Sequence, residues 1–402
     1  MNYAYNSVGR LHYSWAKRVL ATLLSTRRGG IAVAAEIADV ANRAQFPDAC
    51  RGIGPTGKQI MRAMKYRIDR RRALRLLGGT AAVSLVSVPG ARVQAQTLDK
   101  VSYQTNWRAE AEHGGFYLAV ANGIYKKYGI DCDLRMGGPQ QNPSQMLLGG
   151  RVDMIMSSAF EGLNYVKENL PFLCIAAIFQ KDPQVLISHP NVGNDTLANL
   201  KGKPILIGAA GRTSYWPFLR IKFGFTDDQI RPYTFNMAPF LADKNISQQG
   251  FLSAEPYAIM QAGVNPVIHL LADAGFENYQ TTINISRKMV DEKKDLVQRF
   301  VTASLEGWAE YMKGGPANEA ANAMIKKDNP EMSDDKIAYA IRVMNEKGIV
   351  RSGDALKLGI GAMTDQRWKS FYETMTDAGV FPKGLDAKKA YSLEFVNKGV
   401  GA

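Results

Sequence analysis

From Val101 onward, short continuous apolar runs alternate with segments whose apolar residues recur at helical spacing. Continuous runs predict buried strands and the second pattern predicts amphipathic helices. The predicted elements are strands at 101–107, 130–136, 152–157, 172–179 and 184–188, with helices near 112–128, 141–149 and 159–168 between them. This alternation predicts a mostly parallel sheet covered by helices on both faces.

The pattern starts again after the turn-rich segment 189–195. Strands at 204–208, 231–236 and 266–271, helices near 213–224 and 255–262, and a connecting stretch through 250–253 predict a second α/β unit. From Met289 onward the chain is nearly all helical, with helix-spaced residues Leu296, Phe300, Ser304, Trp308 and Met312, and then Trp368, Phe371, Tyr372 and Met375. We interpret these stripes as core and not as a cofactor site.

The chain is therefore predicted to form two α/β lobes joined by two crossings, with a helical C-terminal part. Lobe I takes residues 96–188 and 281–402, and lobe II takes residues 189–280. A ligand is expected between the lobes at the carboxyl ends of the strands, and hinge closure around it is the expected motion.

Charge is concentrated at the N-terminus. The 402 residues carry 50 Lys and Arg against 37 Asp and Glu, a net charge of +13. Residues 1–95 hold 16 of the basic and 4 of the acidic side chains, so the remaining 307 residues hold 34 and 33. The predicted folded part is nearly neutral, which excludes a nucleic-acid footprint. With 46% hydrophobic residues the chain can bury a sizeable core.

An export signal is predicted at residues 61–95. Arginines at 70–72 and 75 precede an apolar run from Leu76 to Val88, and Val93-Gln94-Ala95 ends it in the manner of a cleavage site. The run is too short to span a membrane. The arginines resemble the twin-arginine (Tat) pattern, with export by the Sec route as the alternative, and we expect cleavage after Ala95. The mature protein is expected in the periplasm.

Residues 1–60 precede this signal and are interpreted as a non-native extension, because signals begin close to the initiator methionine. Met61 or Met64 would then be the true start. The glycines of residues 52–59 resemble a phosphate loop, but Gln59 stands where Ser or Thr would hold magnesium. We therefore reject a nucleotide site there.

Few residues could support catalysis or metal binding. Residues 96–402 contain three histidines without metal-ligand spacing (His113, His189 and His269) and no nucleophilic serine elbow. Cys132 and Cys174 lie in apolar runs and are interpreted as small buried hydrophobic residues, with a disulfide as the weaker alternative. No cofactor, no metal and no enzymatic activity are predicted.

Aromatic and polar residues gather instead at the predicted strand ends. In the first lobe these are Asn106, Trp107, His113, Tyr117, Ser157 and Ser158. In the second lobe they are Arg212, Thr213, Tyr215, Trp216 and Glu255. We expect Trp107, Tyr117 and Tyr215 or Trp216 to stack on a flat ligand, His113, Ser157, Ser158 and Thr213 to form hydrogen bonds with it, and Glu255 to accept from an amino edge. Packing of Trp107 under the first helix and an ordinary helix-terminal charge at Glu255 are the alternatives.

These residues resemble the periplasmic substrate-binding proteins of ABC transporters for nitrate, sulfonates and thiamine precursors. The resemblance spans residues 98–395 and rests on Asn106-Trp107, His113, Tyr117-Leu118-Ala119, Asn122-Gly123, Gly129-Ile130, Leu148 to Met154, and Leu200 to Lys203. It implies the type II periplasmic-binding-protein fold, a monomer, and an ABC permease and ATPase as partners. The branch for thiamine pyrimidine precursors is the most similar. Sulfonate, nitrate and flavin ligands remain open, with Arg212 as the candidate anion donor.

The fold is shared with the fungal thiamine pyrimidine synthase, which is the enzymatic alternative. The resemblance places the synthase's histidine at His113, but its pyridoxal lysine corresponds to Ser157, which cannot form an imine. The cysteine-rich iron motif would fall near residues 279–287, which contain no cysteine. We therefore expect a binding protein, and its ligand to be a small aromatic nitrogen heterocycle.

Overall fold

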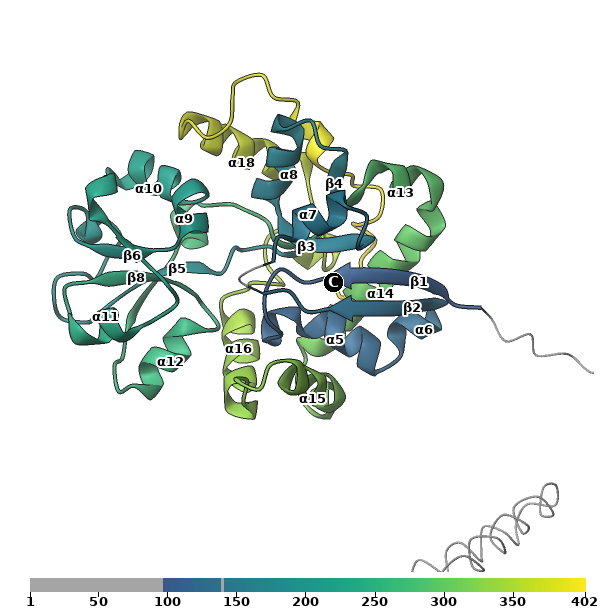
Figure 1. Ribbon diagram of the computed structural model, residues 1–402, viewed down its shortest axis with the longest axis horizontal. Coiled ribbons are helices and arrows are strands. Elements are labelled where there is room, and N and C mark those ends of the chain that lie inside the picture. The colour runs from purple at the N-terminus through teal and green to yellow at the C-terminus, as the bar shows by residue number, and fades with distance from the viewer. Residues whose placement is uncertain (1–96, 139–140) are drawn as a thin grey trace, which may run out of the picture. The chain divides into compact units, whose positions relative to one another are not determined.

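Two five-stranded sheets organise the chain in the computed structural model, which describes residues 97–138 and 141–402. We call the part built on the first sheet lobe I (Figure 1). Its strand order is β2-β1-β3-β10-β4, with β1 at Asp99–Gln104, β2 at Ile130–Arg135, β3 at Met154–Ser158, β4 at Phe172–Phe179 and β10 at Gln280–Ser286. β1 runs parallel to β2 and β3, whereas β10 is antiparallel to both β3 and β4.

Lobe II is built on the second sheet, in the order β7-β6-β8-β5-β9. The strands are β5 at Gln184–Ser188, β6 at Ile205–Ile207, β7 at Ile230–Pro232, β8 at Ser247–Phe251 and β9 at Val267–Leu270. β6 is parallel to β7 and β8, and β5 is antiparallel to β8 and β9. Each sheet thus has a parallel part and an antiparallel strand near its centre.

The two α/β lobes agree with the fold predicted from sequence, but the sheets are mixed and not mostly parallel. The antiparallel strands are β5 and β10. Each is the first strand after a crossing between the lobes, so the chain begins it at the end of the sheet where the crossing arrives. Because β5 pairs with β8 and β9, the first crossing lies ahead of Gln184, and the boundary placed at Ser188 moves toward the N-terminus. β8 and β10 were not predicted, since glutamine, threonine and asparagine interrupt their apolar residues.

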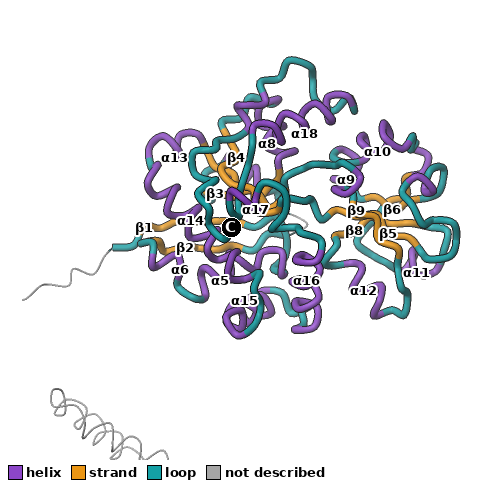
Figure 2. Tube along the Cα trace, turned by 180° about the vertical axis from the view of Figure 1, so that it is seen from behind, coloured by secondary structure: helices purple, strands orange, loops and turns teal. Residues whose placement is uncertain are grey.

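Helices cover both sheets. Those of lobe I are α5 (Gly114–Ala121), α6 (Ile124–Lys127), α7 (Pro143–Leu148), α8 (Ala159–Lys167), α13 (Arg287–Glu292), α14 (Lys294–Tyr311), α15 (Glu319–Asp328), α16 (Asp334–Glu346), α17 (Ala355–Leu358) and α18 (Asp365–Asp377). Lobe II has α9 (Ala209–Thr213), α10 (Trp216–Phe223), α11 (Ala238–Ala242) and α12 (Glu255–Gln261). Figures 1 and 2 show α9 and α10 on one side of the second sheet, and α11 and α12 on the other.

Two helices predicted as continuous are interrupted. The helix expected at 112–128 is a short 3-10 turn, η1 (Ala111–His113), followed by α5 and α6, which are separated at Gly123 with φ +71°. The helix expected at 213–224 corresponds to α10, while its first residue, Thr213, ends the short helix α9 and residues 214–215 separate the two. Pro217 lies in the first turn of α10, where its missing N–H costs no hydrogen bond. Both interruptions lie beside residues that favour helix ends or starts, Gly123 and Pro217, which the spacing of apolar residues does not take into account.

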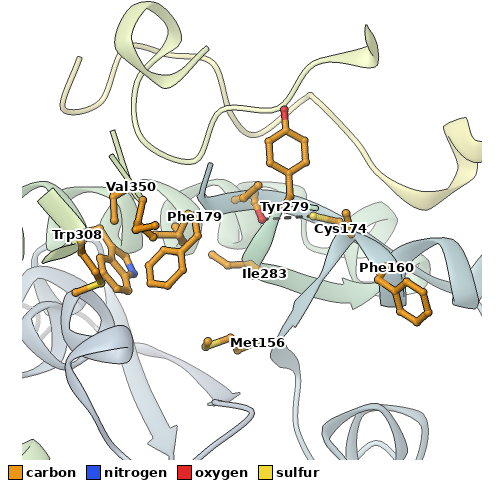
Figure 3. Packing of buried hydrophobic residues seen from close by; sticks show 14 of the residues in the cluster. Met156, Phe160, Cys174, Phe179, Tyr279, Ile283, Trp308 and Val350 are labelled. Carbon is orange, nitrogen blue, oxygen red and sulfur yellow. Dashed lines mark hydrogen bonds between the residues drawn. The ribbon is translucent and has the colours of Figure 1, made fainter. Parts of the chain in front are cut away.

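The C-terminal aromatic stripes form core, as predicted. Phe300 and Trp308 of α14 are fully buried, as is Trp368 of α18 apart from 1% of its surface. Figure 3 shows Trp308 beside Phe179 of β4, and their ring centroids are 5.4 Å apart. Cys132 and Cys174 are both unpaired, and Cys174 is buried while Cys132 is half-buried. The disulfide alternative is therefore not realised.

Several predictions concern residues outside the described part of the chain. These are the extension at 1–60, its rejected phosphate-loop pattern, the export signal at 61–95 and the cleavage after Ala95. Within residues 97–138 and 141–402, no helix combines the length and the apolar character that crossing a membrane requires.

Candidate functional site

A cleft with two connected compartments lies between the lobes. Asn106, Met156, Gln184 and Ala210 line both compartments, and they come from lobe I and lobe II in equal number. The cleft is bounded by residues that follow β1, end β3 and β8, or begin the helix after β6. These are carboxyl ends of parallel strands, where open α/β sheets bind their ligands.

The first, or aromatic, compartment has a volume of about 280 Å³. Its lining includes Trp107 of lobe I and Phe235 of lobe II, whose ring centroids lie 5.2 Å apart. The Trp107 carbonyl accepts from Thr105 Oγ1 at 3.0 Å and from the Gly137 amide at 3.1 Å, which fixes the backbone that carries the indole. Phe235 is 56% exposed and has φ +62°, an uncommon conformation for a bulky residue.

Three carboxylates converge on this compartment. Glu110 and Glu112 come from the segment at η1, and Glu255 is the first residue of α12. Glu255 accepts from the Phe251 amide at 2.7 Å and from the Tyr233 hydroxyl at 3.4 Å, whereas Glu112 accepts from Ser253 of the other lobe. Burial raises the pKa of all three, and Glu112 raises the pKa of Glu110 further.

His113 lines the same compartment and is 1% exposed. Its Nδ1 atom is buried and has no hydrogen-bond partner. Burial lowers the pKa of His113 to about 3, so the imidazole is neutral at physiological pH. A neutral imidazole with a free nitrogen can donate to or accept from a ligand, according to its tautomer.

The second, or polar, compartment has a volume of about 460 Å³. Its polar lining includes Gln141, Asn142, Ser144, Ser157, Ser158, Asp182, Gln184, Thr213, Ser214, Tyr215, Asn278 and Gln280. Asp182 and Asn278 lie at the two crossings, and Asn278 Nδ2 donates to Asp182 Oδ2 at 2.7 Å. Burial raises the pKa of Asp182 to about 6. The structure thus pairs the two crossings directly under the ligand cleft.

The structure brings eight of the eleven residues predicted for the site to the cleft. Trp107, His113 and Glu255 line the aromatic compartment, Ser157, Ser158, Thr213 and Tyr215 line the polar one, and Asn106 lines both. Not all of them face the ligand freely, since Tyr215 donates to Gln249 at 2.9 Å and Ser158 accepts from the Glu161 amide at the start of α8.

Three predicted residues line neither compartment. Tyr117 is buried against α15 and donates to Asp328 at 2.8 Å, and Trp216 is buried with its indole bonded to Asp227 at 2.9 Å. His113 and Tyr117 were expected to share a helix face, but His113 precedes α5, so helical spacing does not relate them. Arg212 is exposed outside both compartments.

Sequence reasoning missed several lining residues. Phe235 lies in a loop, and Gln249 lies on the unpredicted strand β8, so neither belongs to a periodic pattern. Asp182 and Asn278 meet only because both crossings pass beneath the cleft. Glu110 and Glu112 were visible beside Trp107, but their convergence with Glu255 depends on how the lobes close.

The model of one protein family matches residues 110–318, which is more than half of the chain. The chain belongs to the NMT1/THI5 like family. The matched segment runs from the residue before η1 through lobe II to the helices after β10, and so includes most of the cleft.

Relatives with assigned names are mainly binding proteins. A riboflavin-binding protein of Chloroflexus aurantiacus is 23% identical and covers 80% of this chain and 92% of its own length. A formylaminopyrimidine-binding protein of Halalkalibacterium halodurans is 21% identical over 57% of this chain and 71% of its own. A 4-amino-5-hydroxymethyl-2-methylpyrimidine phosphate synthase of Aspergillus parasiticus is 26% identical, but it covers only 28% of this chain and 34% of its own.

Solved structures confirm the periplasmic-binding-protein fold. The aliphatic sulphonate binding protein of Escherichia coli superposes with a TM-score of 0.56 at 14% identity, over 73% of this chain and 91% of its own. The alkanesulfonate-binding protein of Xanthomonas axonopodis gives a TM-score of 0.53 at 12% identity, over 74% and 98%. Together with the family these neighbours confirm the resemblance to ABC-transporter substrate-binding proteins, which take small-molecule ligands.

Proposed function

We propose that this protein is the solute-binding component of an ABC importer and captures a small aromatic nitrogen heterocycle in the periplasm. The observation that carries the proposal is the aromatic compartment, where Trp107 and Phe235 from opposite lobes contact each other in a lining that also holds carboxyl groups and a neutral imidazole. Flat rings suit the two aromatic side chains, and ring nitrogens and amino groups suit the polar ones.

A thiamine pyrimidine precursor is the preferred ligand. A volume of about 280 Å³ suits a single substituted ring, and Glu255 and His113 offer an acceptor and a neutral donor or acceptor for its edge. The formylaminopyrimidine-binding relative supports this choice.

A flavin is the second candidate, because the polar compartment adds about 460 Å³ of space next to the aromatic one. Hydroxyl, amide and carboxylate groups along it would suit a hydroxylated chain attached to a ring system. The riboflavin-binding relative supports this alternative.

Sulfonate and nitrate fit this cleft poorly. Among the described residues that line the two compartments there is no lysine or arginine, and several carboxylates are present. Anions require donors or positive charge, so the same carboxylates would repel them. Arg212, the donor considered from sequence, lies elsewhere.

The proposal is for binding without catalysis. Ser157 lies in the polar compartment at the position where the similar synthase would carry its pyridoxal lysine, and serine cannot form that imine. The protein would act as an exported monomer that delivers its ligand to a permease and ATPase. The export signal at 61–95, and delivery to a transporter instead of a sensor, are parts of the same proposal.

Native mass spectrometry of the protein purified without refolding tests the function. It is combined with a thermal-shift screen of pyrimidines, flavins, sulfonates and nitrate, because a ligand that binds only the folded state raises the melting temperature. A pyrimidine that co-purifies or stabilises supports the preferred ligand, and a flavin supports the second. Stabilisation by sulfonate or nitrate alone would contradict the aromatic-site argument.

A further inference from the structure

The aromatic compartment contains more carboxyl groups than the binding of a neutral heterocycle requires. Glu110 and Glu112 approach it from lobe I and Glu255 approaches it from lobe II. No lysine or arginine is among the described residues of the lining. Lys336 of α16 acts on all three carboxylates from outside, but no described cation lies within 4 Å of any of them. Glu112 and Glu255 accept hydrogen bonds from the protein, but no positively charged side chain of the described residues is in direct contact with any of the three carboxyl groups.

Burial of three carboxyl groups close together raises the free energy of their ionised forms. Glu112 is 2% exposed, and Glu110 and Glu255 are half-buried. Like charges that are close together and poorly solvated oppose ionisation, and the pKa of each carboxyl is raised accordingly. The other titratable groups that face the cluster are His113, Tyr215 and Tyr233 of lobe II, Tyr311 of α14 and Lys336. Lys336 is the single lysine or arginine among these groups.

Two further observations indicate that this cluster is a binding subsite. His113 lines the same compartment, and its Nδ1 atom is buried without a hydrogen-bond partner in the protein. A polar group of a ligand can form this missing hydrogen bond. Trp107 and Phe235 line the same compartment, and aromatic rings attract cations.

We propose that the aromatic compartment binds a planar head group that carries a positive charge, which the carboxyl groups of Glu110, Glu112 and Glu255 contact from the two lobes. The inference rests on the proposed function and narrows its ligand to an aromatic cation, such as a protonated amino-substituted heterocycle or an amidine. Ser253, which donates to Glu112 across the cleft, brings the two acidic surfaces together, so closure alone increases the repulsion that the ligand relieves.

The ionisation of these carboxyl groups predicts how affinity depends on pH. At acidic pH the carboxyl groups are neutral and attract a cation weakly. As pH rises through their elevated pKa values they ionise, and the affinity for a permanent cation increases. The affinity for a neutral ligand of the same shape should not increase when the carboxyl groups ionise.

Benzamidine and benzamide are the probes, since they have nearly the same shape and only the amidine is charged from about pH 5 to about pH 8. Their dissociation constants for the intact protein are measured by ligand-observed NMR across this range. At neutral pH benzamidine should bind about tenfold or more tightly than benzamide, as expected for a charged hydrogen bond. Its affinity should rise with pH while that of benzamide stays level.

Glu112→Gln and Glu255→Gln test the residues, and each should reduce the preference for benzamidine and flatten its pH dependence. Glu255→Gln keeps the test informative if the more deeply buried Glu112→Gln fails to fold. Glu373→Gln, on the exposed side of α18, is the matched control and should leave both unchanged. Equal binding of the two probes, or a preference retained in both cleft variants, overturns the inference.

The neutral 4-amino-5-hydroxymethyl-2-methylpyrimidine separates this inference from the proposed function. If it binds while benzamidine shows no advantage over benzamide, the charge assignment fails and the receptor for a heterocycle stands. If neither the pyrimidine nor either probe binds and the protein co-purifies with an anion, both proposals fail.

Discussion

Trp107 and Phe235 show how single residues define the cleft. Trp107 follows β1 and is held through its backbone carbonyl, whereas Phe235 lies in a lobe II loop with a positive φ. A bulky residue in that conformation is strained, and such strain persists where the surrounding structure requires it. Exposure of 56% indicates that Phe235 is presented to the cleft mouth and is not part of the core.

Removal of the Trp107 indole should weaken ligand binding. As a stacking surface in a desolvated compartment it should contribute about 1–3 kcal/mol, so Trp107→Ala is expected to lose that much affinity for the pyrimidine or flavin identified by mass spectrometry. Isothermal titration of the folded variant measures the loss. Trp216→Phe serves as control, because Trp216 lies outside both compartments. Unchanged affinity in Trp107→Ala would remove this residue from the site.

Asp182 predicts a pH dependence of stability in the empty protein. Burial raises its pKa from an ordinary value of 3.8 to about 6, so the folded state holds its proton more tightly than the unfolded state. The resulting stabilisation is complete below about pH 4 and is lost as pH rises through about 6. Thermal melts of Asp182→Asn should therefore lose less stability than wild type over this interval. Asp273→Asn, an exposed position, should follow wild type.

At the scale of elements, two glycines allow α5 to lie against α14. A Cβ at Gly114 would lie 2.0 Å from the Tyr311 ring, and one at Gly115 would lie 2.2 Å from the Trp308 ring. This close approach places His113 and η1 at the cleft, directly ahead of α5. The glycines therefore link core packing to the position of the binding residues.

Gly115→Ala should consequently destabilise the fold by about 1–3 kcal/mol, because the indole of buried Trp308 has to move. Urea unfolding monitored by circular dichroism measures this change. Gly138→Ala is the matched control, since a Cβ there meets nothing within 4 Å. Equal free energies of unfolding for the two variants would show that α5 and α14 can move apart without loss of stability.

At the scale of the whole two-lobed unit, Arg367 connects both crossings. From α18 its guanidinium donates to the Gln180 carbonyl at 2.6 Å and to the Glu277 carbonyl at 3.1 Å, and it lies 4.8 Å from the centre of the Tyr279 ring. The lobes also meet at Tyr257 and Tyr339, whose centroids are 5.2 Å apart. Hinge motion requires the crossings to change backbone angles, so we expect a group that bonds to both crossings to restrict such motion.

Arg367→Ala should loosen the hinge more than it weakens either core. We expect a larger radius of gyration by small-angle X-ray scattering for the empty variant, and weaker ligand binding because fewer molecules occupy the closed state. Lys369→Ala, two residues along α18 in an exposed surface pair, is the control. Wild-type scattering and affinity in Arg367→Ala would mean that the crossings are rigid without it.

The sequence by itself determined the two α/β lobes, the helical C-terminal part and the aromatic core stripes. Hydrophobic periodicity reports which face of each element is buried, and that information is local. It also placed Trp107 and Ser157 at the cleft from the ends of predicted strands, and His113 and Glu255 from the starts of predicted helices.

Only the tertiary structure decided the rest. Polar strands such as β10 are buried by neighbours distant in sequence, and the pairing of Asp182 with Asn278 depends on two crossings 96 residues apart. Tyr117 donates a hydrogen bond to Asp328 and Trp216 donates one to Asp227, and both side chains lie outside the cleft. The meeting of three carboxylates from two lobes is likewise a property of how the lobes are placed, because no local pattern specifies contacts between separate sheets.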